Sequence, residues 1–355
     1  MADQKLYLRP IGFLYGPPAD AAVEDGLALP LAGGPIAFTS AVLIEGDPKS
    51  SQRRLVTARA LNDTTDADLT ALLARVTGRR APFAGLTLAR PVLMGIVNVT
   101  PDSFSDGGLY DEMEGAVSHA AELASAGAAI IDIGGESTRP GSDTVADDDE
   151  LSRVVPVLDE LKGSPAVISI DTRKAAVARA AGRAGAKILN DVSALTHDPA
   201  CLGVAVEEGL DVVLMHAQGD PKTMQDNPAY DDVVLEVFNY LEARIGACEK
   251  AGIARSSIAA DPGLGFGKTL RHNLALLASI SLFHGLGVPL LVGASRKRFI
   301  GGLGQGEDPK SREPGSHAAA IASAAQGAQL FRVHDVAGSR QALAVWRASM
   351  FGFEK

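Results

Sequence analysis

The sequence lacks the features that mark secreted and membrane-spanning chains. It has only two cysteines, Cys201 and Cys248, which stand far apart without the short spacing of metal ligands. Buried free thiols are therefore expected, rather than a disulfide or a zinc site. No apolar run approaches the roughly 20 residues that span a bilayer, and the start, MADQKLYLRP, has no charged-then-apolar signal layout. A cytoplasmic location without a membrane partner is the expectation.

The chain also lacks the positive charge of a nucleic-acid-binding protein. It carries 33 Lys and Arg against 43 Asp and Glu, a formal net charge of -10. Repulsion of polyanions at long range counts against nucleic acid as a partner. An anionic small substrate therefore needs a locally positive pocket. Apolar residues make up 46% of the 355 residues, which is ample for a large core.

Residues 1–90 differ from the rest of the chain. Short β-like segments at residues 5–8, 35–39 and 41–44 are separated by Gly and Pro. One helix is expected over residues 65–76, starting with Thr65 and Asp68, and residues 78–82 have the composition of a linker. We predict a small N-terminal extension of mixed α/β character, of unknown role.

From residue 91 onward, short runs rich in Val, Ile and Leu alternate with Ala-rich helical patterns. The strand-like runs lie at residues 93–97, 129–133, 167–170, 187–189, 212–215, 258–260, 290–292 and 330–333, with helical patterns such as 114–126, 174–184 and 316–326 between them. Strict alternation predicts parallel strands with right-handed crossovers, and eight units predict an α/β fold, a (β/α)8 TIM barrel over residues 91–355. An open doubly wound sheet is the alternative, but no Gly-x-Gly-x-x-Gly fingerprint follows the first strand.

Polar or charged residues follow every predicted strand, at the ends where the chemistry of such a barrel sits. They are Asn98, 135–141, Asp171 and Thr172, Asn190 and Asp191, His216, 261–263, 295–297 and 332–335. Asp171 and Asp191 have the alternative role of helix caps. The first loop, NVTPDSFSDGG at residues 98–108, offers many oxygen ligands, although a plain surface turn is the alternative for that loop alone.

Basic groups gather at one side of the predicted mouth. Arg332 and His334 stand two residues apart on a strand, hence on one face, and a helix is expected to begin near residue 337. Two bases beside a helix amino end suit an anion such as phosphate. Asn98 and the oxygens of its loop suit a Mg²⁺ that the same phosphates share.

The other side of the mouth is rich in acceptors. Asp171, Asn190 and Asp261 suit a flat heterocycle with amino and ring N–H donors, and Lys297 supplies a donor opposite them. A ring with a phosphorylated arm is the ligand that this layout indicates.

Residues 261–269 imitate a nucleotide-binding phosphate loop, but Pro262 stands where the first glycine is needed. We therefore expect no such loop, and we expect Lys268 to be solvated. His216 is expected to be a satisfied buried histidine rather than a catalytic one.

Eight motifs of the predicted barrel resemble the dihydropteroate synthases of folate biosynthesis. They are NVTPDSFSDGG (98–108), DIGGESTRPGS (132–142), ISIDT (168–172), ILNDVSA (188–194), VVLMH (212–216), DPGLGFGK (261–268), GASRKRFIG (293–301) and RVHDV (332–336). The match spans the whole barrel, and its first two motifs are highly specific. The resemblance implies a Mg²⁺-dependent transferase, usually a homodimer and a sulfonamide target. The implied reaction joins (7,8-dihydropterin-6-yl)methyl diphosphate to p-aminobenzoate and releases pyrophosphate.

The resemblance also implies roles for individual residues, carried over by position. Asn98 is the implied metal ligand, and the implied pterin contacts are Asp171, Asn190, Asp261 and Lys297. The implied diphosphate contacts are Thr138, Arg332 and His334. Loops 103–107 and 137–141 are implied to close over the site, and the implied substrate contacts beyond these are Phe104, Pro140, Met215 and Phe266. The catalytic candidates are Lys297, Arg332, His334, Asp106 and Arg139.

The chain departs from the family pattern in two places, and three alternative functions stay open. Arg298 stands where relatives can have Ser, and the extension is too short for a fused pterin kinase. The alternatives are a pterin-dependent methyltransferase, a Schiff-base aldolase using Lys297 and a non-catalytic pterin-binding protein.

Overall fold

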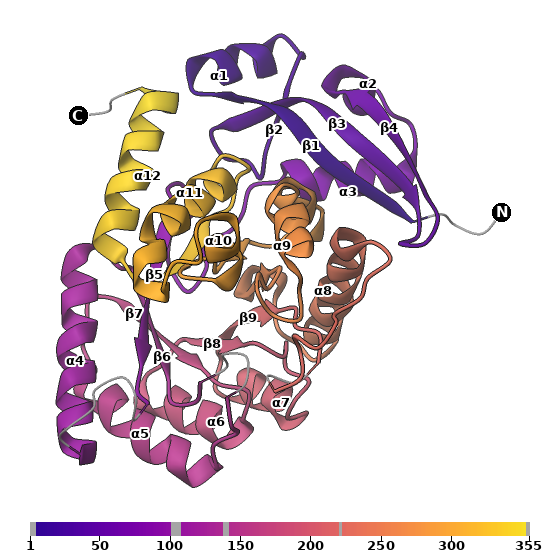
Figure 1. The fold of residues 1–355 in the computed structure, drawn as a ribbon. Coiled ribbons are helices and arrows are strands. Elements are labelled where there is room, and N and C mark those ends of the chain that lie inside the picture. The colour runs from indigo at the N-terminus through magenta and orange to yellow at the C-terminus, as the bar shows by residue number, and fades with distance from the viewer. Residues whose placement is uncertain (1–4, 101–107, 138–141, 220–221, 353–355) are drawn as a thin grey trace.

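Eight parallel strands form a closed ring at the centre of the protein (Figure 1). The computed structural model describes residues 5–100, 108–137, 142–219 and 222–352. The strands are β5 (Val92–Asn98), β6 (Ile130–Gly134), β7 (Val167–Asp171), β8 (Ile188–Asp191), β9 (Asp211–Met215), β10 (Ile258–Asp261), β11 (Leu291–Val292) and β12 (Leu330–Val333). Their order is β10-β9-β8-β7-β6-β5-β12-β11, and a bridge between Ala260 and Leu290 closes the ring. The predicted TIM barrel is confirmed.

A helix follows every barrel strand and packs outside the ring. These helices are α4 (Gly108–Ala126), α5 (Asp147–Glu160), α6 (Ala175–Ala184), α7 (Ala200–Glu207), α8 (Val233–Lys250), α9 (Leu270–Leu277), α11 (Glu313–Ala324) and α12 (Val336–Phe351). Shorter helical segments are η1 (Arg255–Ser257), η2 (Ile280–Leu286), α10 (Arg298–Leu303) and η3 (Pro309–Arg312). Local signals set the ends: the Asp232 side chain accepts from the N–H groups of Val234 and Leu235 at the start of α8, and left-handed Gly185 ends α6.

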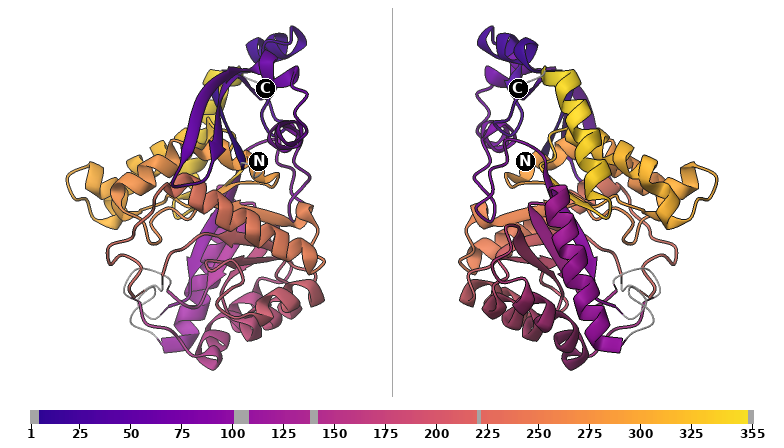
Figure 2. Two further views of the ribbon diagram at one scale, coloured as in Figure 1. Left: turned by 90° about the vertical axis from the view of Figure 1, so that its right-hand side faces the viewer. Right: turned by 90° about the vertical axis from the view of Figure 1, so that its left-hand side faces the viewer.

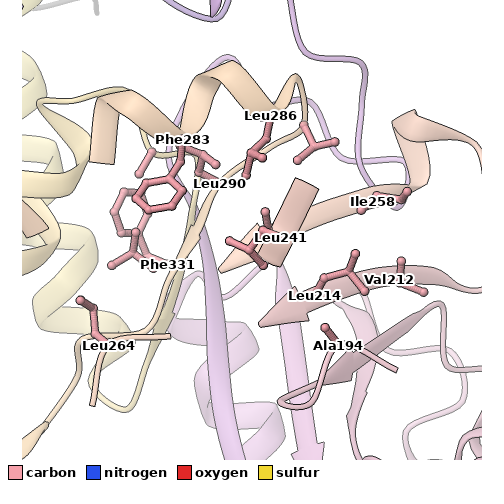
Figure 3. Close-up of a cluster of buried hydrophobic side chains, with 14 of the residues drawn as sticks. Ala194, Val212, Leu214, Leu241, Ile258, Leu264, Phe283, Leu286, Leu290 and Phe331 are labelled. Carbon is pink, nitrogen blue, oxygen red and sulfur yellow. The ribbon is translucent and has the colours of Figure 1, made fainter. Parts of the chain in front are cut away.

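Alternate residues of each strand face opposite sides of the ring. Val213 of β9 points inward, and its neighbours Val212 and Leu214 point outward to the helices, where Leu241 of α8 joins them (Figure 3). The inner cluster consists of Phe83, Val92, Met94, Ile130, Ile188, Val213, Ala259, Leu291 and Leu330. This apolar layer fills the amino-terminal half of the barrel and leaves the carboxyl ends for polar side chains.

The N-terminal extension is an antiparallel sheet with helices. Its elements are β1 (Leu6–Tyr15), α1 (Pro17–Glu24), β2 (Leu29–Pro30), β3 (Ile36–Gly46), β4 (Ser51–Thr57), α2 (Ala58–Asn62) and α3 (Ala67–Thr77). The two β-like segments expected within residues 35–44 are one strand, because β3 pairs with β1 along its whole length. The predicted helix 65–76 begins later than expected, because the Asp66 carboxylate, not Thr65, caps α3 by accepting from Asp68 N and Leu69 N.

Side chains of the extension hold it against the barrel. Arg75 Nε donates to Gly285 O at 2.7 Å, and Ser281 Oγ donates to Pro10 O at 2.8 Å. Residues 83–86 close the amino-terminal end of the ring: Phe83 is fully buried there, and Ala84 N donates to Asp211 Oδ2 at 2.6 Å. Figure 2 shows the N-terminal strands at one end of the molecule, beside α12. The division of the chain at residue 90 stays a prediction.

Both cysteines are buried free thiols, as expected. Among the helices of the described residues, none has the length and apolar content needed to cross a membrane.

Candidate active site

A network of charged side chains crosses the carboxyl ends of β6, β7, β8 and β12. Arg332 Nε donates to Asp132 Oδ2 at 2.6 Å, and Arg332 Nη2 donates to Asp171 Oδ2 at 2.7 Å. Asn190 Nδ2 donates to the same Asp132 oxygen at 3.0 Å. One guanidinium therefore holds two carboxylates from neighbouring strands together.

The strand period explains why these residues meet. Asp132, Asn190 and Arg332 each stand two residues after an inward apolar residue of the lower layer, namely Ile130, Ile188 and Leu330. Because side chains alternate across a strand, the three share the inner face one layer higher. Asp132 was not among the predicted site residues, because it lies inside the predicted strand 129–133 and not after its end. The two-residue step from Ile130 is the signal that identifies it.

The carboxylates of this network are deeply buried and incompletely bonded. Asp132 is 0% and Asp171 6% exposed. Asp132 Oδ1, Asp171 Oδ1 and Ser169 Oγ have no hydrogen-bond partner among the residues that the structure describes. Burial raises the pKa of Asp171 to about 7, although the guanidinium of Arg332 acts against this shift. Buried acceptors without donors are costly, so a ligand with N–H groups fits here.

Asp261 and Lys297 lie on the neighbouring part of the mouth. Asp261 Oδ1 accepts from Gly263 N at 2.7 Å, and burial raises the pKa of this carboxyl against the opposing charge of Lys297. A Cβ atom on Gly293 would lie 3.7 Å from Asp261 Oδ2 and 3.8 Å from Arg332 Cβ, so Gly293 separates the two residues. Lys297 Nζ lies 3.9 Å from the centre of the Phe266 ring, a cation–π contact.

The remaining predicted residues divide into those at the mouth and those outside the described part. His334 Nδ1 lies 2.9 Å from Ser295 Oγ, and Met215 ends β9 with 4% exposure. Asn98 ends β5 half-buried, and its amide has no hydrogen-bond partner within the described ranges. The predicted site residues that lie outside the described residues are Phe104, Asp106, Thr138, Arg139 and Pro140.

The prediction that Lys268 is solvated is wrong. Lys268 is 3% exposed, and its ammonium group donates to His216 O at 3.1 Å and Phe266 O at 2.9 Å. The third neighbour is His216 Nδ1 at 2.9 Å. Burial lowers the pKa of His216 to about 2, so the neutral ring accepts at Nδ1. His216 is thus the satisfied buried histidine that we expected.

In the loop around Lys268, backbone N–H groups donate to other atoms of the protein. Gly263 has φ +69°, and a Cβ atom there would lie 1.9 Å from His216 O, so only glycine fits. Gly265 N donates to Asn273 Oδ1 at 2.6 Å. Because the N–H groups of Gly263 and Gly265 already have acceptors within the protein, this loop does not form the phosphate cradle that its sequence imitates.

Asp191 lies just beyond this network. Its carboxylate accepts from Ser193 N and Ser193 Oγ, both at 2.6 Å, and from Leu195 N at 3.1 Å. These bonds hold the turn after β8, so its role there is structural.

Comparisons with known proteins show which family this chain resembles. The profile of the family described as "Pterin binding enzyme" matches residues 94–334. The dihydropteroate synthase of Escherichia coli K12 is 50% identical over 271 residues, which cover 76% of this chain and 95% of that protein.

Two solved structures resemble the barrel closely. The Yersinia pestis dihydropteroate synthase in a sulfonamide drug complex has a TM-score of 0.71 and 48% identity, covering 74% of this chain and 96% of that one. The Xanthomonas albilineans enzyme with 4-aminobenzoic acid has a TM-score of 0.71 and 50% identity, covering 75% and 96%.

The buried ammonium of Lys268 predicts a pH dependence of stability. Burial lowers its pKa from 10.5 to about 7, so between these pH values the unfolded chain holds a proton that the folded chain has released. The free energy of unfolding should therefore rise with pH across this window, by at most about 1.4 kcal/mol per pH unit. Urea unfolding of the unsubstituted chain and of Lys268→Met at pH 6.5 and 9 measures the difference in slope.

Exposed Lys250 provides the control, because Lys250→Met should keep the slope of the unsubstituted chain. Equal slopes for the unsubstituted chain and Lys268→Met would contradict the assignment of this proton to Lys268.

Proposed function

The chain belongs to the dihydropteroate synthases within the pterin-binding enzymes, and we propose how the described residues of its barrel mouth carry out that reaction. The reaction condenses (7,8-dihydropterin-6-yl)methyl diphosphate with p-aminobenzoate to give 7,8-dihydropteroate and pyrophosphate in folate biosynthesis. The observation that carries the assignment of roles is the buried acceptor set of Asp132 and Asp171 around Arg332. The proteins compared above give no support to a pterin-dependent methyltransferase.

We assign the pterin ring to the acceptor-rich side of the mouth. Its amino and ring N–H groups match the unpaired Oδ1 atoms of Asp132 and Asp171, and Asp261 supplies a further carboxylate. Asn190 keeps one side of Asp132 occupied, which orients that carboxylate toward the ligand. A ligand with N–H donors thereby removes the cost of the unpaired oxygens.

The diphosphate is assigned to Arg332 and His334. The predicted separation of a basic side from an acceptor side is wrong for Arg332, because its guanidinium bonds to Asp132 and Asp171. Arg332 binds the two carboxylates through Nε and Nη2, and no bond from Nη1 to a described residue is present. Its Nη1 donors are therefore available to an oxygen of the leaving group. Thr138 stays a predicted contact outside the described residues.

The p-aminobenzoate ring is assigned to the surface made by Phe266 and Lys297. The Lys297 ammonium lies 3.9 Å from the centre of the Phe266 ring, and Lys297 also stays the predicted donor to the pterin. The ammonium group can meet a negatively charged ligand there. Phe104 and Pro140 lie outside the described residues, and their assignment to this pocket rests on the family motifs alone.

The reaction forms a carbon–nitrogen bond as the carbon–oxygen bond to the diphosphate breaks. Negative charge grows on the departing oxygen, where Arg332 and His334 stabilise it. The positive charge left on the pterin spreads over a ring that faces Asp171 and Asp261, which favours a loose, dissociative displacement. The neutral aromatic amine attacks once it is oriented. The positively charged nitrogen formed is acidic and gives its proton to water, so no strong base is needed.

Mg²⁺ is the proposed metal, and Asn98 is its proposed protein ligand. A single neutral amide oxygen without a hydrogen-bond partner suits an ion that keeps several waters and binds phosphate oxygens. When bound, the ion supplies charge neutralisation at the diphosphate. We also propose a homodimer in the cytoplasm, which rests on the family resemblance. Sedimentation equilibrium of the full chain tests the dimer.

Arg332→Ala should lower turnover on the order of 100-fold or more, because a positive group is lost where charge develops. The assay is pyrophosphate release from the pterin diphosphate, with and without p-aminobenzoate. Arg340 on α12 is exposed and provides the control, since Arg340→Ala should keep normal turnover. Asp261→Ala should mainly abolish pterin binding. Normal turnover of Arg332→Ala would count heavily against the anion site.

Asn98→Ala should raise the Mg²⁺ concentration for half-maximal rate on the order of tenfold, because one ligand is lost. A titration of the EDTA-treated enzyme with Mg²⁺, at saturating substrates, measures this shift. Full activity of the metal-free enzyme, or an unchanged Mg²⁺ midpoint in Asn98→Ala, would remove Asn98 from the metal site.

A further inference from the structure

A cleft of about 640 Å³ separates the N-terminal sheet from the barrel, outside the mouth. Residues of the sheet strands β1, β3 and β4 form one wall, and residues of the amino end of α8, of α9 and of η2 form the other. No predicted site residue lines this cleft. Its volume is large enough for an organic molecule rather than a single ion.

The register of the sheet places two arginines on the face toward the barrel. Ile44 of β3 pairs with Tyr7 of β1 and with Arg53 of β4, so the three side chains share one face. Arg9 stands two residues beyond Tyr7 and lies on that same face. Arg9, Ile44 and Arg53 all line the cleft.

Arg9 has no acidic partner in the part of the chain that the structure describes. Its Nη1 donates to Ser279 Oγ at a long 3.4 Å, and its Nε is buried without a hydrogen-bond partner. A buried guanidinium N–H without an acceptor is costly. The Arg9 guanidinium therefore lacks a negatively charged hydrogen-bond acceptor in the cleft.

The other charges of the cleft do not neutralise Arg9. Asp232 contacts Arg53 and also caps α8. Asp231 and Arg271 are exposed at the rim, and no ion pair joins Arg271 to a described residue. The remaining wall is largely apolar, with Ile44, Val233, Ala275 and Leu282.

We propose that this cleft binds a small organic carboxylate with an apolar body. The carboxylate accepts from Arg9 and from the hydroxyl of Ser279, and the body packs against Ile44 and Leu282. A single guanidinium with one hydroxyl matches one carboxylate, and the apolar wall favours a hydrocarbon body over an inorganic anion. Binding in the cleft does not depend on the reaction at the mouth.

The cleft shares a wall with the loop of the active site. Tyr230 lines the cleft, and its hydroxyl donates to Gly267 O at 2.8 Å. Thr269 also lines the cleft and follows Lys268, the residue that holds Phe266 O from the other side. The cleft therefore adjoins the segment that carries Phe266, through Tyr230 and Thr269.

Isothermal titration of the full chain with octanoate at pH 7 tests the site. Octanoate has the carboxylate and the apolar body but lacks the amine and the aromatic ring of p-aminobenzoate. Arg9→Gln should weaken binding by at least about tenfold, since a hydrogen bond to a charged group is lost. Arg59→Gln, on exposed α2, removes the same charge outside the cleft and should keep the affinity of the unsubstituted chain.

A second variant and a competition experiment complete the test. Arg9→Lys keeps the charge and should bind better than Arg9→Gln, and equal urea midpoints show that these variants fold alike. Inorganic phosphate should compete poorly, because it has no apolar body. Equal octanoate affinity in the unsubstituted chain and Arg9→Gln, or competition by phosphate at the same concentration as octanoate, would overturn the proposal.

Discussion

The pairing of Arg332 with Asp132 and Asp171 is the constraint on which the mouth of the barrel depends. Two carboxylates, 0% and 6% exposed, face each other across neighbouring strands, and one guanidinium compensates them both. Removing one partner of such a buried set typically costs about 3–5 kcal/mol. The remaining oxygen of each carboxylate has no partner among the described residues, and we propose that the N–H groups of the pterin bind there.

Each of these strands carries an inward apolar residue and, two residues later, an inward polar residue. The first stabilises the barrel, and the second belongs to the site. Apolar inward residues such as Ile130 and Ile188 close the lower layer with Phe83, and Asp132 and Asn190 stand one layer above them. A shift of register by one residue would turn the acids outward and the aliphatic residues of the outer layer inward. The apolar layer thus fixes the height at which the polar network forms.

The sequence predicts the barrel well because strand composition and alternation are local properties. All eight predicted strand runs correspond to β5–β12. Asp171, Asn190, Asp261 and Arg332 stand on four of these strands, and Arg332 bonds to Asp171. The errors concern contacts between distant segments. The burial of Lys268 depends on His216, 52 residues away in the chain. The continuity of β3 depends on pairing with β1, which no property of residues 35–44 alone reveals.

The extension forms one wall of a cleft whose other wall includes Tyr230 and Thr269, next to the active-site loop. Residues 266–269 are held from one side by Lys268, which binds Phe266 O and His216 O, and from the other by the Tyr230 hydroxyl at Gly267 O. The Tyr230 hydroxyl thus links the cleft to Gly267, which is next in the chain to the Phe266 ring that contacts Lys297. Arg9 and Tyr230 both line the cleft, so the sheet and this loop lie on the same cavity.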